Sequence, residues 1–158
     1  LESRLNAYAL EQGVSPDDIQ FIVIDACTLS PEASRVVAVS LPQSAPTGSR
    51  LRVPVTVENC GRTLWPPTRR SRIKVGVRFF RKGPNGPGRT WVEARADLEA
   101  PVGPGEVLET VIAVRLRDVP PGEYEARFDM VNEGRYWFEE RGSRSLRQTI
   151  RILPRQGL

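Results

Sequence analysis

The chain has 158 residues, of which 39% are apolar and 27% are charged, a composition that supports a buried core and excludes a disordered chain. It contains no histidine, which excludes Ser-His and Cys-His catalytic pairs and the usual zinc sites. The formal net charge is +4, and no apolar run approaches the roughly 20 residues needed to cross a bilayer.

The first 34 residues predict a helix, a turn and a buried strand, which is typical of an α/β layer. Leu1, Leu5 and Tyr8 share one helical face, and residues 21–24 form an uninterrupted apolar run. Because the chain begins at Leu1 rather than at a methionine and shows no basic-then-apolar leader, we expect a soluble piece of a longer protein. We expect residues 1–34 to be the tail of a preceding α/β domain; a helix-and-strand addition docked on the next domain is the alternative.

Residues 35–154 predict an all-β fold, an immunoglobulin-like antiparallel β-sandwich of about seven strands. Short runs of alternating apolar and polar residues are separated by turns that contain proline and glycine. Strands with one polar face each are best buried as two sheets stacked face to face. The expected strands are residues 36–41, 51–57, 73–79, 91–94, 108–116, 124–130 and 146–153.

Two residues within these strands make sharper predictions. Pro54 interrupts the run Leu51–Val57 and lacks a backbone donor, which predicts an edge or a bulge at that point. Tyr124 follows Pro121 and Gly122 at the start of the sixth strand, where immunoglobulin-like folds often place a tyrosine that bonds back to a nearby turn.

The sequence offers no constellation of catalytic or metal-binding residues. Cys27 and Cys60 lack the spacing of a metal site, so buried thiols are expected, with a disulfide between them as the alternative. Glu139 and Glu140 are neighbours, and neighbouring residues along a strand point to opposite faces. They therefore do not form the facing pair of carboxylates that a glycosidase needs. We therefore expect no catalytic residue, no cofactor and no metal site.

Aromatic residues near loops are the remaining candidates for a binding site. Trp65, Trp91, Tyr136 and Trp137 could stack on sugar rings or anchor a protein partner. The alternative is that Trp65, Trp91, Trp137 and Phe138 fill the ends of the sandwich, which we favour because consecutive strand residues cannot all face one way.

The basic residues are nearly all arginine, since Lys74 and Lys82 are the only lysines. The arginines are scattered along the sequence, which favours a solvated surface over a nucleic-acid face. We expect no nucleic acid among the partners and no insertion into a membrane.

Three segments resemble a family of bacterial immunoglobulin-like accessory domains that are often appended to glycosyltransferases and methyltransferases of surface polysaccharide assembly. They are residues 55–67 (VTVENCGRTLWPP), 120–134 (PPGEYEARFDMVNEG) and 137–146 (WFEERGSRSL). The first is also similar to the tryptophan-containing immunoglobulin-like domain of autophagy receptors, which is a protein-binding module. The resemblance covers about residues 51–153 and transfers no catalytic residue. It implies a sandwich with a binding or spacing role in glycan assembly, in a cytoplasmic bacterial protein that reaches the cytoplasmic membrane face through a parent protein.

Two function classes follow, neither of them catalytic. The first is a carbohydrate-recognition or substrate-positioning domain of a larger enzyme. The second is a structural spacer or protein-interaction module that docks a partner, including the catalytic domain of a parent enzyme. An exposed row of aromatic side chains favours the first class, whereas buried tryptophans with an exposed aliphatic or strand-edge patch favour the second.

Overall fold

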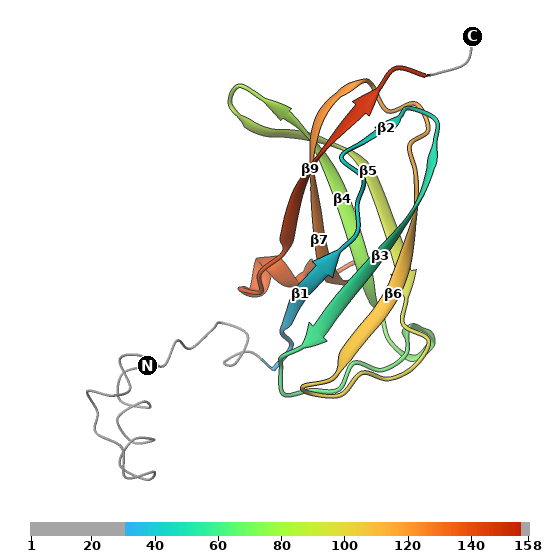
Figure 1. Ribbon diagram of the computed structural model, residues 1–158. Coiled ribbons are helices and arrows are strands. Elements are labelled where there is room, and N and C mark those ends of the chain that lie inside the picture. Colours follow the sequence, from blue (N-terminus) through green and yellow to red (C-terminus); the bar gives the residue numbers. More distant parts are fainter. Residues whose placement is uncertain (1–30, 156–158) are drawn as a thin grey trace.

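The computed structural model describes residues 31–155, which form two β-sheets stacked face to face (Figure 1). The helix, turn and strand predicted for residues 1–34 lie almost entirely outside the described residues, as does Cys27. The predicted immunoglobulin-like sandwich is confirmed, and residues 31–155 contain no α-helix and no helix that could span a bilayer.

One sheet has three strands and the other has six. In the first sheet β3 (Arg50–Asn59) lies between β1 (Ser34–Val39) and β6 (Val107–Arg115), antiparallel to both. The second sheet follows the order β2 (Ser44–Pro46), β9 (Leu146–Leu153), β7 (Gly122–Asn132), β4 (Ile73–Gly83) and β5 (Gly86–Asp97). A short strand, β8 (Tyr136–Trp137), pairs with the end of β7, and two 3-10 helices, η2 (Thr68–Arg70) and η3 (Phe138–Arg141), lie between strands.

The seven predicted strands all exist, with differences at their ends. Residues 146–153 form β9 with the predicted bounds, whereas β5 extends well beyond the predicted residues 91–94. The extension forms a hairpin with β4 whose residues 81–89 are exposed, so no alternation of buried and exposed positions marks it in the sequence. The two additional strands, β2 and β8, have three and two residues, too few for a pattern of period two to be recognised.

The first strand of the sandwich is divided between the two sheets. β1 runs antiparallel to β3, and after a break the chain continues as β2, which runs parallel to β9 in the other sheet. This division closes the sandwich along one side, because the same chain segment borders both sheets.

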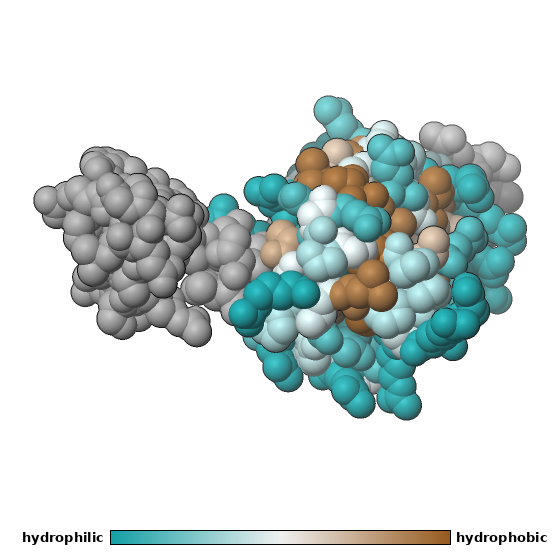
Figure 2. Space-filling model, turned by 90° about the horizontal axis from the view of Figure 1, so that it is seen from below, coloured by the Kyte–Doolittle hydropathy of each residue, from teal (hydrophilic) through white to brown (hydrophobic). Residues whose placement is uncertain are grey.

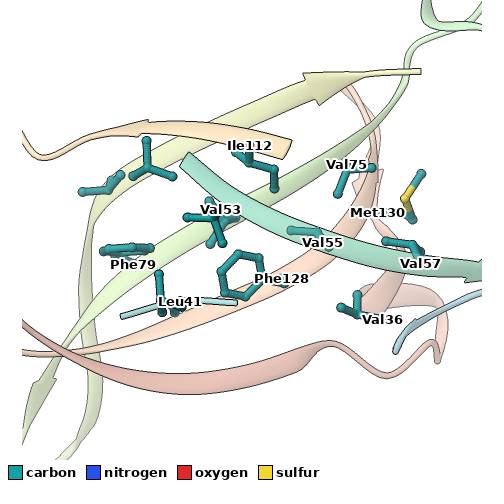
Figure 3. Packing of buried hydrophobic residues seen from close by; sticks show 14 of the residues in the cluster. Val36, Leu41, Val53, Val55, Val57, Val75, Phe79, Ile112, Phe128 and Met130 are labelled. Carbon is teal, nitrogen blue, oxygen red and sulfur yellow. The ribbon is translucent and has the colours of Figure 1, made fainter. Parts of the chain in front are cut away.

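The core consists of the inward positions of both sheets (Figure 3). Val53, Val55 and Val57 of β3 lie across from Phe79 of β4 and Phe128 of β7, and all five side chains are buried. The alternate positions of the strands predicted at residues 108–116 and 124–130 are buried as well; they are Ile112, Val114, Leu116, Tyr124, Ala126, Phe128 and Met130. Each fully buried side chain of this size contributes about 1.5–3 kcal/mol to folding, so this cluster stabilises the sandwich substantially.

The structure confirms the prediction for Tyr124 and corrects the one for Pro54. The Tyr124 hydroxyl donates a hydrogen bond of 2.6 Å to the carbonyl oxygen of Pro120, which ties β7 to the preceding turn. Pro54 lies in the central strand β3, not at an edge, but it stands where pairing with β1 ends. Its carbonyl accepts from the Ser40 N–H at 3.0 Å. The backbone N–H that proline lacks would have pointed to the same side, toward the segment that follows β1.

Candidate functional site

Trp65 is fully buried and fills one end of the sandwich. Its ring meets Phe138 edge to face, with the centroids 5.9 Å apart. Its backbone N–H and carbonyl both pair with Val102, at 2.9 Å each. The indole N–H has no hydrogen-bond partner among residues 31–155. With no exposed face, Trp65 cannot stack on a ligand in this arrangement.

Trp137 is half-buried on the outer face of the six-stranded sheet, where two guanidinium groups lie against its ring. Arg78 is 4.0 Å and Arg95 4.6 Å from the ring centroid. Gly76 leaves the room for the ring, because a Cβ at this position would lie 2.7 Å from two ring carbons. Arg95 is held in turn by Glu133, with Nε 2.8 Å from the carboxylate, and this bond lowers the pKa of Glu133. A sugar ring could reach this indole face only by displacing arginines that already occupy it.

The two remaining aromatic candidates are also covered in part. Trp91 packs against the core from β5 and carries the Arg89 guanidinium 4.2 Å from its centroid. Tyr136 packs against the core from β8, with Arg141 4.2 Å from its centroid, and its hydroxyl donates to the Glu32 carboxylate. The structure therefore distributes the four candidates over the core, β5 and β8 and does not bring them together into one exposed row.

Asp129 is a buried acid that the sequence reasoning missed. One carboxylate oxygen accepts from the Met130 N–H at 2.8 Å and the other from the Glu139 N–H at 2.7 Å. Burial raises the pKa of Asp129 to about 7, although these two N–H groups act in the opposite direction. The carboxyl thus anchors the start of η3. Asp129 stands at an outward position of β7, and the β8–η3 segment covers it there. The alternation of β7 therefore predicts an exposed side chain at this position and could not indicate its burial.

A groove of about 610 Å³ opens at the end of the sandwich where β3 and β7 finish, between the segment joining β3 to β4 and the turn after β7. Figure 2 looks onto this end, where hydrophobic residues lie among hydrophilic ones. The groove combines arginine, small polar and aliphatic side chains. Its lining residues are Glu32, Thr63, Leu64, Pro66, Arg69, Arg70, Ser71, Arg72, Ile73, Asn132 and Arg135.

Hydrogen bonds within the segment 59–73 fix one wall of this groove. The buried Asn59 side chain donates to the carbonyls of Thr63 and Val102 and accepts from the Gly61 N–H, which closes the turn at the end of β3. The Ser71 hydroxyl donates to the Pro66 carbonyl at 3.1 Å and accepts from the Ile73 N–H. The wall is therefore preformed.

The groove carries a positive charge that nearby acids do not neutralise. Arg69 donates to the Glu99 carbonyl, whereas the side chains of Arg70, Arg72 and Arg135 form no ion pair within residues 31–155. Glu32 is the one acid in the lining and accepts a hydrogen bond from the Tyr136 hydroxyl.

The arginines were expected to be scattered, but four of them gather at this end of the molecule. Three of them lie within four residues of sequence, Arg69, Arg70 and Arg72, and Arg135 joins them only through the fold. The run at residues 69–72 was the signal that could have indicated the groove.

Residues 31–155 hold no group of three or more His, Cys, Asp or Glu side chains placed to bind a metal ion. No protein-family model matches the chain, and no curated protein matches it.

Several solved structures are similar in fold. An alkylpurine DNA glycosylase of Pseudomonas fluorescens bound to DNA matches with 15% identity and a TM-score of 0.48, over 78% of this chain and 31% of the glycosylase. The sporulation control protein Spo0M of Bacillus subtilis matches with 17% identity and a TM-score of 0.48, over 77% of this chain and 49% of that chain. A CARDB domain of Pyrococcus furiosus in complex with di-metal ions matches with 15% identity and a TM-score of 0.42, over 78% and 94%. At these identities and scores the similarities carry no argument about function.

Proposed function

We propose that this chain is a non-catalytic accessory domain that binds a protein partner through the groove at the end of its sandwich. The observation that carries the proposal is the contrast between the two kinds of candidate surface. Every aromatic candidate is buried or partly covered by arginine, whereas the groove is open and places the half-exposed Leu64 beside arginines. Aliphatic contacts with a charged rim are typical of protein interfaces.

The volume of the groove supports binding of a defined segment. A site of about 610 Å³ falls within the range of about 300–1,000 Å³ that is usual for pockets that bind small molecules. Because hydrogen bonds hold its wall in place, little ordering entropy is lost when a partner binds.

Carbohydrate recognition is the second candidate function, and Tyr136 favours it. This ring lies in a hollow of about 280 Å³ formed with Pro31, Glu32, Thr63 and Arg141, and polar groups beside a ring suit a sugar. The resemblance to accessory domains of polysaccharide assembly points the same way.

The proposal is tested with two matched substitutions, Leu64→Asp and Val107→Asp. The two side chains are similarly exposed, at 52% and 57%, but Leu64 lines the groove whereas Val107 lies on β6 outside it. Wild type and both variants are applied to an array of synthetic peptides and an array of bacterial glycans, with circular dichroism as the control for folding.

We expect peptides to be retained by wild type and Val107→Asp and lost by Leu64→Asp. Peptide binding that survives Leu64→Asp and is lost in Val107→Asp would place the contact on the three-stranded sheet and overturn the proposal. Binding to glycans alone, weakened by Tyr136→Ala, would support carbohydrate recognition in its place.

A further inference from the structure

The positive charge of the groove indicates the chemistry of the segment that would bind there. Four arginines and one glutamate line it, so the arginines outnumber the acid by three. Several arginines elsewhere on the sandwich form ion pairs, as Arg35 does with Glu58 and Arg151 with Glu123. The groove instead gathers Arg70, Arg72 and Arg135, none of which has an ion pair within residues 31–155. Arginine guanidinium groups without an acid partner present forks of N–H donors that match carboxylate oxygens.

A second, smaller hollow adjoins the groove on the side of Tyr136. The hollow around Tyr136 shares Glu32 and Thr63 with the groove, so the two form adjoining sites with a common wall. Arg141 lines the second hollow and adds a further positive charge there. Two adjoining hollows with arginines along them suit an extended chain that carries several carboxylates.

Aliphatic residues in the lining favour a peptide over other polyanions. Leu64 and Pro66 offer contact to amino-acid side chains above the buried Ile73. The groove lining itself contains no aromatic ring on which a nucleic-acid base or a sugar could stack, since Tyr136 lies in the adjoining hollow. We therefore propose that the groove binds an aspartate- or glutamate-rich segment of the partner protein, an inference that rests on the proposed function and names the partner's chemistry.

The test measures binding of fluorescein-labelled octaglutamate by fluorescence anisotropy at low ionic strength, with octaglutamine as the neutral probe. The variant Arg70→Glu/Arg72→Glu reverses two charges in the groove, and both side chains are exposed without ion pairs among the described residues. Its matched control, Arg50→Glu/Arg52→Glu, reverses two exposed charges on β3 and changes the net charge by the same amount.

We expect octaglutamate to bind wild type and the control, and to bind the groove variant at least roughly tenfold more weakly. Added salt should weaken binding to wild type, because exposed charges are screened. Equal losses in both variants would mean that net charge alone attracts the probe and would overturn the inference. Tighter binding of an oligouronate or an oligonucleotide of equal charge would overturn it in favour of that polyanion.

The preference for acidic segments can fail while the proposed protein-binding function still holds. Peptides that bind through Leu64 but show no preference for acidic residues would leave the protein-binding function standing and remove this inference alone.

Discussion

The hydroxyl of Tyr124 makes one hydrogen bond that can be removed without changing the shape of the core. Tyr124→Phe deletes the donor to the Pro120 carbonyl and leaves that oxygen without its partner. We expect the free energy of unfolding in urea to fall by about 1–2 kcal/mol with an unchanged m value. An unchanged midpoint would show that the bond does not stabilise β7 against its preceding turn.

Gly76 is required by the ring of Trp137. In Gly76→Ala the new Cβ would lie 2.7 Å from two ring carbons, so the indole must leave its place against Arg78 and Arg95. We expect a loss of about 1–3 kcal/mol in stability and a shift in tryptophan emission. The control is Gly83→Ala, whose Cβ would make an ordinary contact of 3.7 Å. Wild-type stability and emission in Gly76→Ala would contradict the packing described.

At the scale of elements, the link between β7 and η3 should make stability depend on pH. Burial raises the pKa of Asp129 from its ordinary 3.8 to about 7. Between about pH 4 and pH 7, the Asp129 carboxyl is therefore protonated in the folded state and ionised in the unfolded state. The contribution of Asp129 to stability is therefore fully present below about pH 4 and is lost as pH rises to about 7.

The comparison with Asp129→Asn isolates this group from the other acids. The difference in unfolding free energy between wild type and the variant should change in that pH window and be constant above it, as measured by urea titrations at several pH values. A difference that is independent of pH would show that Asp129 is ionised in both states. Glu133, whose pKa is lowered by Arg95, acts in the opposite direction and is present in both proteins.

The elements that alternation of polarity defines were predictable, and those that depend on distant parts of the chain were not. β9 has the predicted bounds because its alternating residues pack one face on the core. β2 and β8 exist because they pair with β9 and β7, which no pattern within three residues can indicate. Pro54 was predicted to mark an edge or a bulge, yet it lies in the central strand β3. A proline is tolerated there because the pairing with β1 ends next to it, at Val55.

The candidate site was less predictable than the fold. An aromatic ring near a loop looks the same in sequence whether it fills the core, as Trp65 does, or lies under arginines, as Trp137 does. Only the fold brings Arg135 to the arginines at residues 69–72. Local sequence indicates charge, whereas the groove that gathers it is a property of the tertiary structure.

At the scale of the whole molecule, the sandwich acts as a rigid frame that holds loops at its end. The turn closed by Asn59 and the segment held by Ser71 are fixed by buried or partly buried hydrogen bonds. A second hollow, of about 440 Å³, lies over β2, β7 and β9, but its arginine, Arg151, forms an ion pair with Glu123 in the same lining. The groove at the end of the sandwich differs from it in gathering arginines without an acid partner among the described residues.

The most direct test of binding at this end is a map of amide chemical shifts in the isotope-labelled protein during titration with octaglutamate. We predict saturable shifts concentrated in residues 61–73 and 132–136, with the strands of the three-stranded sheet unchanged. Shifts centred on β3 and β6, or distributed evenly over the surface, would contradict a binding site in the groove.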